Sequence, residues 1–414
     1  MAKAAGWWFD ASTWVEGVPP SGAGATLTLG DSSTYSLGAA LYGMTNDVTI
    51  GHIVYPAEKT KANGSFFVGD LNFGTERPTT EYPSHDGHAF GYGQDKTITF
   101  DAGGGASRFA NDNPESVHGS PNGAFMMLMR PLCLKSDLEV TGIGRKDVNI
   151  ISQPAFAMAL GEDIKSDEGK HGLTFNVGTA TKFTDPAAIY GENSDFTGDV
   201  TVQRGNLRLI SKDSLEHEDT TPLGHDNNVY VTSGEGYLDI GDHKIGKTQH
   251  LYIGTLASSI TTAGSILSSY SDRTWWPEWK GKVTLTDNAF IGGYVHANSG
   301  YNSGRGNLLI SGDIDDGGNG YSLTIRAIQA DRAVRLTGQN TYSGGTVLSS
   351  GAHLGAAEGA LGTGPVTWSG GVYHYEGDAS CDIAALGGAN SGAFNVHVPE
   401  GVTYTPATTI GKHS

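Results

Sequence analysis

The chain has 414 residues, of which 61 are glycine, 37% are hydrophobic and only 17% are charged. Its net charge of −18 at pH 7 argues against a nucleic-acid-binding protein and against attachment to an anionic membrane, because both depend on lysine and arginine. Aromatic residues make up 9% of the chain and Val, Ile and Leu recur in short blocks, which excludes a disordered chain and favours short strands joined by tight turns.

The N-terminal stretch MAKAAGWWFDASTW has no apolar signal-peptide core. Three explanations are open: a removed export signal, a mature form placed behind a new methionine, or synthesis in the cytoplasm and release by lysis. The tryptophans of this stretch are expected to cap the first strand layer, because the end of a stack exposes an apolar floor and an unpaired edge. Attachment or an oligomer contact is the alternative for these residues, which are Trp7, Trp8 and Trp14.

The region 1–150 is expected to hold this cap and the first strand layers, interrupted by irregular insertions at 76–93 and 103–123. His85 and His88 have a spacing that could ligate a metal, but without a third ligand nearby they are interpreted as loop histidines. No metal site and no cofactor is predicted. No stretch reaches the length of a transmembrane helix.

The sequence predicts very little helix and no disulfide bond. Only Asp331 to Leu336 has apolar spacing suited to a turn or two of helix. The cysteines Cys133 and Cys381 lie in strand-like contexts, LCL and SCDI, which favours two buried thiols over a disulfide.

A long unit occurs twice, once within 151–257 and once within 308–414. IYGENSDFTGDVTVQRGNLRL (189–209) aligns with LTGQNTYSGGTVLSSGAHL (336–354) through G-x-N, an aromatic, a glycine and a β-branched run. A long-period repeat of strands and turns without helices indicates a solenoid, in which stacked coils bury their inner faces and pair their backbone amides. The predicted turn residues are Gly191, Asn193 and Gly198 in the first copy and Gly338, Asn340 and Gly344 in the second.

The second copy, followed by ALGTGPVTWSGG, resembles the autotransporter-associated β-strand repeat, a family of glycine-rich right-handed parallel β-helices. The first copy departs from that pattern at Asp199, where glycine is usual, and in an insertion at 216–222. The predicted fold is therefore all-β: a right-handed single-stranded parallel β-helix (solenoid) with irregular loop insertions and a capped N-terminal end.

The region 258–307 is expected to continue the β-helix and to carry a tryptophan-rich loop at 268–280. Its WWPEW motif does not resemble a strand interior, and exposed tryptophans stack on sugar rings or anchor protein partners. Trp275, Trp276 and Trp279 are therefore candidate ligand-binding or partner-binding residues. The alternative is a loop that folds back and covers the edge of a strand layer.

A glycan-cleaving enzyme on such a scaffold would need paired carboxylates. The candidate pairs also suit turns or a solvated surface, and DIDDGGNG (313–320) lacks the spacing of known calcium loops. No catalytic residue is assigned, and enzymatic activity is not favoured. The carboxylates considered are Asp195 with Asp199, Asp313 with Asp315 and Asp316, and Glu216 with Glu218.

The sequence favours a non-enzymatic, extracellular structural or adhesive rod, and most of all a virion appendage such as a tail spike, tail fibre or head fibre. The expected location is the virion or the cell surface. Expected partners are further copies of the chain, with a trimer favoured, other virion or surface proteins, and a surface glycan. One alternative is a secreted autotransporter-type passenger adhesin, favoured by the end VTYTPATTIGKHS, which resembles the start of another repeat. The other is a polysaccharide-degrading β-helix enzyme.

Overall fold

The fold is built from short parallel β-strands. The computed structural model describes residues 6–7, 20–28, 39–43, 46–55, 65–68, 96–112, 126–128, 131–142, 158–161, 163–167, 169–178, 187–210, 220–254, 265–268, 275–292, 307–326, 333–349, 351–368, 370–375, 394–397, 403 and 410–412. These ranges contain strands and turns but no helix, and so no helix that could cross a membrane. The all-β prediction is confirmed for them.

The chain forms two compact units. Unit 1 comprises Met1–Leu207 with Pro222–His225, and unit 2 comprises Arg208–Thr221 with Asp226–Ser414. The four regions predicted from the sequence, with boundaries after residues 150, 257 and 307, follow the repeats and stay a prediction.

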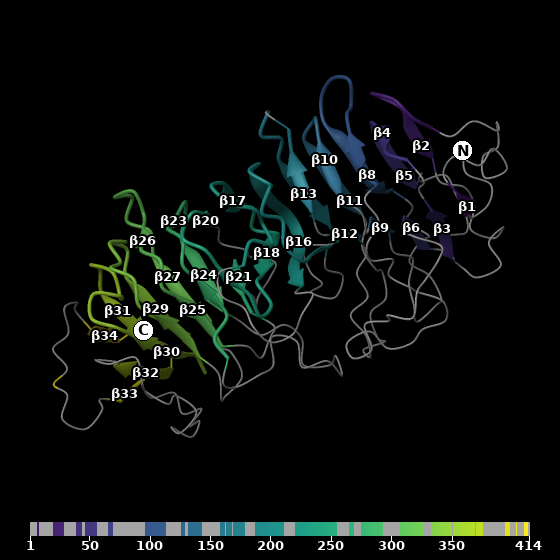
Figure 1. Ribbon diagram of the computed structural model, residues 1–414. Coiled ribbons are helices and arrows are strands. Elements are labelled where there is room, and N and C mark those ends of the chain that lie inside the picture. Colours follow the sequence, from purple (N-terminus) through teal and green to yellow (C-terminus); the bar gives the residue numbers. More distant parts are fainter. Residues whose placement is uncertain are drawn as a thin grey trace. The chain divides into compact units, whose positions relative to one another are not determined.

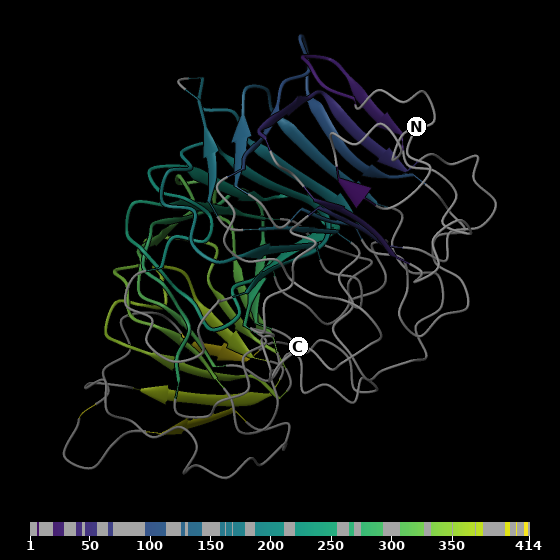
Figure 2. The ribbon, with the colours of Figure 1, turned by 45° about the vertical axis from the view of Figure 1, so that its right-hand side comes forward.

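Unit 1 contains three parallel ladders of strands, and consecutive strands from β4 to β15 join them in turn (Figures 1 and 2). Ladder 1A is β4 (Val48–Ile50), β7 (Ile98–Phe100), β10 (Leu132–Leu134) and β13 (Ile164–Ser166). Ladder 1B is β2 (Thr26–Thr28), β5 (His52–Tyr55), β8 (Ser107–Asn111), β11 (Leu138–Gly142), β14 (Leu173–Val177) and the part of β16 (Val200–Ile210) that pairs with β14, from Val200 to Arg204. Ladder 1C is β1 (Gly6–Trp7), β3 (Ala39–Gly43), β6 (Ser65–Val68), β9 (Met126–Leu128), β12 (Met158–Leu160) and β15 (Ala187–Tyr190).

Unit 2 repeats this arrangement with three ladders of its own, which the strands from β17 to β28 join in turn. Ladder 2A is β17 (Asn228–Val231), β20 (His250–Ile253), β23 (Val283–Leu285) and β26 (Ile314–Asp315). Ladder 2B is β18 (Gly236–Asp239), β21 (Ile266–Leu267), β24 (Ala289–Gly292), β27 (Leu323–Arg326), β29 (Thr346–Leu348), β31 (Val366–Trp368) and β34 (Ile410–Lys412). Ladder 2C is β19 (Lys244–Ile245), β22 (Glu278–Trp279), β25 (Leu308–Ile310), β28 (Val334–Leu336), β30 (His353–Ala356), β32 (Gly371–Tyr375) and β33 (Phe394–His397). In both units the order of strands is compatible with a parallel β-helix.

The core consists of inward side chains that stack in register from strand to strand. Because successive residues of a strand point to opposite faces, parallel pairing in register places like positions above one another. Each stacked side chain is thereby removed from water by its neighbours, at roughly 25 cal/mol for each Å² of apolar surface. In ladder 1B the fully buried stack is Leu27, Ile53, Phe109, Val140, Phe175 and Val202, and in ladder 2A it is Val229, Leu251, Val283 and Ile314.

The asparagines of the two repeat copies make matching hydrogen bonds. Asn193 accepts the Ile164 N–H at 2.8 Å and donates to the Pro222 carbonyl at 2.7 Å. Asn340 accepts the Ile314 N–H at 2.8 Å and donates to the Ala360 carbonyl at 2.6 Å. Each is almost fully buried, with 1% and 5% of its surface exposed. A single side chain thus ties its own layer to backbone that precedes it and backbone that follows it in the chain.

The predicted turn glycines are required for two different reasons. Gly191 has a φ of 66°, the left-handed region that suits glycine. The other three do not have positive φ, but a Cβ would clash with backbone. It would lie 1.9 Å from the His171 carbonyl oxygen at Gly198, 2.4 Å from that of Gly312 at Gly338, and 2.3 Å from that of Gly320 at Gly344.

Several sequence predictions were wrong. The insertion expected at 103–123 contains β8, because Phe109 fills the stack between Ile53 and Val140. The helical turn expected near Asp331 to Leu336 is a strand from Val334, paired on both sides in ladder 2C. Cys133 faces outward on β10 and is half-buried, so it is not a core thiol.

Candidate functional site

The candidate site is the outward side of ladder 2C around Trp275 and Trp276. Both tryptophans are half-buried and precede Pro277, which is buried and leads into β22. The residue before a proline favours an extended conformation, which applies here to Trp276. The segment that carries the two indoles is therefore not part of a helical turn. The Trp275 indole N–H donates to the Asp242 carbonyl at 2.8 Å, and the Asn307 side-chain amide donates to the Trp275 carbonyl at 3.3 Å.

Each indole carries a cation against its ring. The Lys244 Nζ lies 4.5 Å from the centroid of the Trp275 ring, and the Arg335 Cζ lies 4.2 Å from that of the Trp276 ring. Attraction of this kind holds the cation through the electron-rich face of the ring. It restricts the orientation of the lysine or arginine side chain against the ring.

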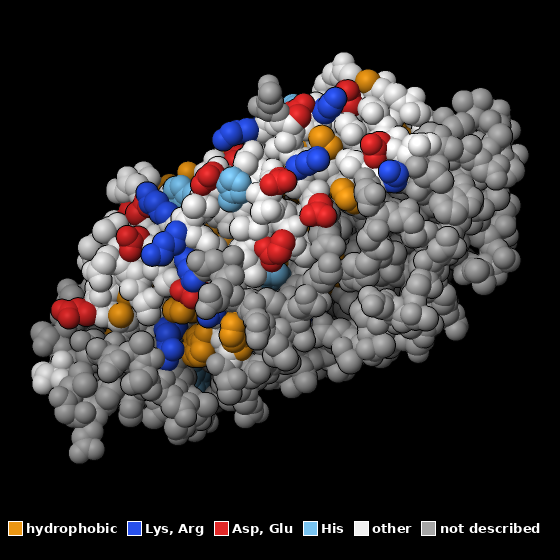
Figure 3. Space-filling view, in the orientation of Figure 1, with side chains coloured by type: hydrophobic (Ala, Val, Ile, Leu, Met, Phe, Trp, Pro, Cys, Tyr) orange, Lys and Arg blue, Asp and Glu red, His pale blue; other side chains and the backbone are white. Residues whose placement is uncertain are grey.

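Strand register brings these cations into one line with a carboxylate. Lys244 is aligned with Glu278, Glu278 with Leu309, and Leu309 with Arg335. The Glu278 Oε1 accepts a short hydrogen bond from the Ser311 hydroxyl. We call this set, Lys244, Trp275, Trp276, Glu278, Ser311 and Arg335, the tryptophan–cation face. In the space-filling view, hydrophobic side chains lie beside Lys and Arg side chains in the region of β25 (Figure 3).

The interpretation of Trp279 as a binding residue is corrected by its burial. Its side chain is 0% exposed and stands between Ile245 and Ile310 in the inward stack of ladder 2C. Glu278, its neighbour in sequence, points to the other side of the strand. The motif therefore places two tryptophans at the surface and one in the core.

A second cluster lies on the outward side of ladder 2A. The Tyr230 and Tyr252 rings stack with centroids 4.8 Å apart, and the His250 ring stacks on Tyr252 at 4.1 Å. The His250 Nε2 lies 2.9 Å from the Thr284 Oγ1. The three rings therefore form one continuous stack along neighbouring strands.

This stack ends in a chain of polar groups around Asp315. The carboxylate accepts hydrogen bonds from the Thr284 hydroxyl at 3.1 Å and the Gly317 N–H at 3.0 Å, and its Oδ2 lies 2.9 Å from the Lys282 Nζ. Burial alone would raise the pKa of the Asp315 carboxyl, but its bond to Lys282 and the other hydrogen bonds lower it. Burial and the Lys282 charge lower the pKa of His250, against the opposing influence of Asp315. The lowered pKa values favour the ionised form of Asp315 and the neutral form of His250.

Asp316, which lies in the DIDDGGNG segment, anchors a turn. Its Oδ1 accepts the Gly318 N–H at 2.9 Å, and its Oδ2 accepts the N–H groups of Gly320 and Tyr321 and both the N–H and the hydroxyl of Ser343. Burial would raise the pKa of this carboxyl, but the hydrogen bonds from Ser343, Gly318 and Gly320 lower it. The described ranges contain no group of three or more His, Cys, Asp or Glu side chains placed to hold a metal ion.

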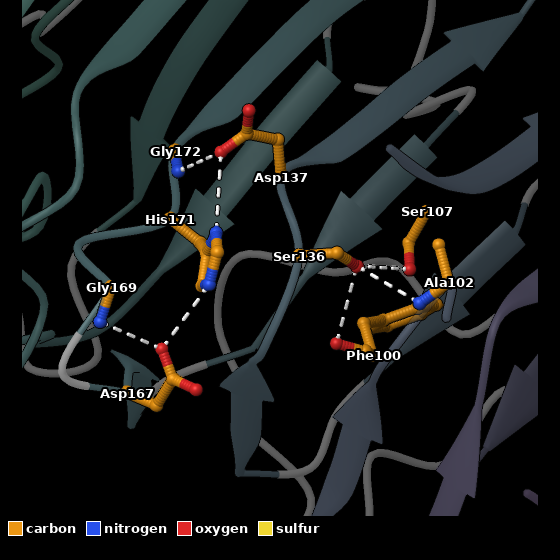
Figure 4. A network of polar contacts seen from close by, with 9 residues as sticks. All are labelled: Phe100, Ala102, Ser107, Ser136, Asp137, Asp167, Gly169, His171 and Gly172. Atoms are coloured by element: carbon orange, nitrogen blue, oxygen red, sulfur yellow. Dashed lines mark hydrogen bonds and ion pairs between the residues drawn. The ribbon is translucent and has the colours of Figure 1, made fainter. Parts of the chain in front are cut away.

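In unit 1 a histidine lies between two carboxylates (Figure 4). The His171 Nε2 is 3.2 Å from the Asp167 Oδ1, and its Nδ1 is 3.7 Å from the Asp137 Oδ1. The carboxylates also accept the N–H groups of Gly169 and Gly172, each at 2.9 Å. The network joins the turn after β13 to the turn before β11.

Beside it, Ser136 and Ser107 form a buried hydroxyl pair (Figure 4), with their Oγ atoms 2.7 Å apart. Ser136 also accepts the Ala102 N–H at 3.2 Å and donates to the Phe100 carbonyl at 3.4 Å. Both networks of unit 1 connect turns, which is a structural role.

The remaining candidates are dispersed or lie outside the described residues. Asp195 and Asp199 are exposed in the turn before β16, and Trp7 lies in β1 with its backbone aligned to Gly43. The candidates outside the described residues are Trp8, Trp14, His85, His88, Glu216, Glu218 and Cys381.

The sequence interpretation missed Lys244, Glu278 and Arg335, which come from three different strands. Alternation within each strand marks them as outward residues, but only the register shows that they are neighbours. Comparison with known protein families, with curated proteins and with solved structures finds no match for this chain.

Proposed function

We propose that the protein is a non-enzymatic structural and adhesive rod, and that it attaches to a surface through the tryptophan–cation face. The proposed fold is a right-handed, single-stranded parallel β-helix of the autotransporter-associated repeat type. Its first layer is proposed to be capped by the tryptophans of the N-terminal stretch, of which Trp7 lies in β1. Stacked layers that share hydrogen bonds form a stiff support, which suits a component that must act at a distance.

The observation that carries the adhesive part is the placement of Trp275 and Trp276. Two half-buried indoles that each hold a cation, on the outward side of a regular ladder, have no role in the inward stack. Tryptophan and arginine are the residues most enriched where proteins bind partners tightly. A virion appendage such as a tail spike, tail fibre or head fibre, acting at the virion or host surface as a homotrimer, is the proposed setting.

A second setting is a surface-displayed passenger adhesin of the autotransporter type, favoured by the repeat residues around Asn340. Immunogold labelling of virions and of cells, with antibody raised against this chain, separates the two settings. The mass of the protein in solution tests the trimer, and a monomer at micromolar concentration counts against the virion spike.

The adhesive function is tested by binding of the purified chain to intact bacterial cells and to arrayed surface polysaccharides. We expect binding that is lost in Trp276→Ala and retained in Phe290→Ala. Phe290 is a matched control because Arg326 lies 3.8 Å above its ring on ladder 2B, outside the proposed face. Equal loss in both variants, or release of reducing ends from a bound polysaccharide, contradicts the proposal.

A further inference from the structure

We infer that the tryptophan–cation face binds an extended acidic polysaccharide that lies along the stacking direction of ladder 2C. This inference rests on the proposed adhesive function and names the chemistry of its ligand. Three properties of the face support it: the spacing of its cations, the groups between them, and the charge of the rest of the chain.

The cations come from well-separated strands of one ladder, which suits a ligand with several charges. Lys244 and Arg335 are aligned positions three strand intervals apart, through Glu278 and Leu309. At about 4.8 Å for each interval, their backbone positions are separated by roughly 14 Å. A polymer with repeated acidic groups can contact both positions along the stacking direction, and a second contact within one chain raises the affinity through effective concentration.

The groups between the cations favour sugars. Trp275 and Trp276 offer rigid apolar ring surface beside polar groups, and the Glu278 carboxylate and Ser311 hydroxyl can hydrogen-bond to sugar hydroxyls. The carboxylate repels a ligand that is negative along its whole length. It therefore favours a chain in which neutral, hydroxyl-bearing units separate the acidic ones.

The charge of the whole chain disfavours the other common polyanion. With 44 acidic and 26 basic residues, the protein has a net charge of −18, which opposes long contact with nucleic acid. The face provides local cations in a chain whose net charge is negative. On the side that Figure 3 shows, acidic and basic side chains are interspersed. Because the net negative charge of the chain repels polyanions while the face attracts acidic groups locally, a polymer with few charges is favoured over a densely charged one.

The test measures binding of three uronic-acid polymers, hyaluronan, alginate and polygalacturonate, and of their carboxyl-reduced counterparts. We expect hyaluronan, in which acidic and neutral units alternate, to bind more tightly than the other two polymers, and each reduced counterpart of a bound polymer to bind at least 10-fold more weakly. Lys244→Ala and Arg335→Ala should each weaken binding about 5- to 10-fold, as expected for loss of one charged contact. The controls Lys247→Ala, at an exposed residue outside the face, and Arg326→Ala, at the arginine above Phe290, should change it less than about 2-fold.

Two further measurements sharpen the result. The monomer galacturonate should bind far more weakly than the polymer, because it lacks the further contacts that a second unit of the same chain provides. Glu278→Gln should strengthen binding of polygalacturonate, in which every unit is acidic, more than binding of hyaluronan, in which acidic and neutral units alternate.

The outcomes separate this inference from the proposed function. Binding to cells or neutral polysaccharides that is unaffected by Lys244→Ala and Arg335→Ala overturns the acidic ligand and leaves the adhesive function standing. Binding of single-stranded DNA that depends on both cations, without uronate binding, identifies nucleic acid instead and overturns the inference. Absence of binding to every cell, polysaccharide and uronate polymer overturns both.

Discussion

Replacement of Asn340 by alanine tests whether single buried side chains hold successive layers together. The Asn340 side chain accepts the Ile314 N–H at 2.8 Å and donates to the Ala360 carbonyl at 2.6 Å. These partners lie 26 and 20 residues away in sequence. Alanine keeps the backbone of its own turn and removes both links.

The expected cost follows from the two groups left behind. A buried N–H or C=O without a partner costs about 1–3 kcal/mol. With only 5% of Asn340 exposed, water can replace neither bond well. Asn340→Ala should therefore lower the free energy of unfolding by roughly 2–6 kcal/mol.

The assay is urea unfolding followed by far-UV circular dichroism, with hydrogen exchange as a local probe. Gln339→Ala is the matched control, because Gln339 is exposed and its side chain makes only a 3.3 Å hydrogen bond to the Glu358 carbonyl. That variant should change stability by less than about 0.5 kcal/mol. In Asn340→Ala the Ile314 amide should also exchange faster than in the control.

The reasoning is refuted if Asn340→Ala and Gln339→Ala have the same unfolding midpoint and slope and the Ile314 amide keeps its protection. The layers would then be held by strand pairing and apolar stacking alone. The matching contacts of Asn193 would be a consequence of the turn rather than a cause of stacking.

Three further predictions concern the turns and the ladder 2A cluster. Gly281→Ala should lower the free energy of unfolding by about 2 kcal/mol or more, because a Cβ at this position would lie 1.9 Å from a backbone carbonyl oxygen. Gly246→Ala is the control, because no atom lies within 4 Å of a Cβ placed there, and it should be nearly neutral in the same urea unfolding assay. The lowered pKa of Asp316 adds stability that is complete above its ordinary value of 3.8 and is lost as pH falls through the lowered value. When urea unfolding at neutral pH is compared with unfolding below pH 3.8, Asp316→Asn should therefore lose less stability on acidification than the wild type. An unchanged dependence of stability on pH would contradict this. Lys282→Ala removes a charge that lowers the pKa of His250, so NMR titration should show that pKa rising, and a fall would contradict the assigned cause.

The repeated core could be predicted from the sequence because its determinants are local. Asn193 and Asn340 each follow a glycine by two residues and precede an aromatic that is fully buried, Phe196 or Tyr342. Burial raises the pKa of Tyr342, against its bond to Thr346, as expected for a hydroxyl enclosed in a core. Such a motif repeats because every layer must solve the same problem of turning and stacking.

The burial of Trp279 could not be predicted, because it depends on which residues of the strand point inward and which point outward. A shift of one residue in a strand exchanges the inward and outward faces. WWPEW has two apolar residues before the proline and one after it, and its composition alone does not show which of them enters the stack. The register of β22 with Ile245 and Ile310 decides it.

The tryptophan–cation face could not be predicted for a related reason, which also limits where any site on such a scaffold can form. Inward positions are occupied by stacking residues such as Ile310 and Leu336, so a ligand can meet only the outward residues. Each short strand offers one or two of these, and a site must therefore combine residues from successive layers, as Lys244, Glu278 and Arg335 do. The ligand that such a line of side chains fits is itself extended, because its contacts recur at the interval that separates the strands.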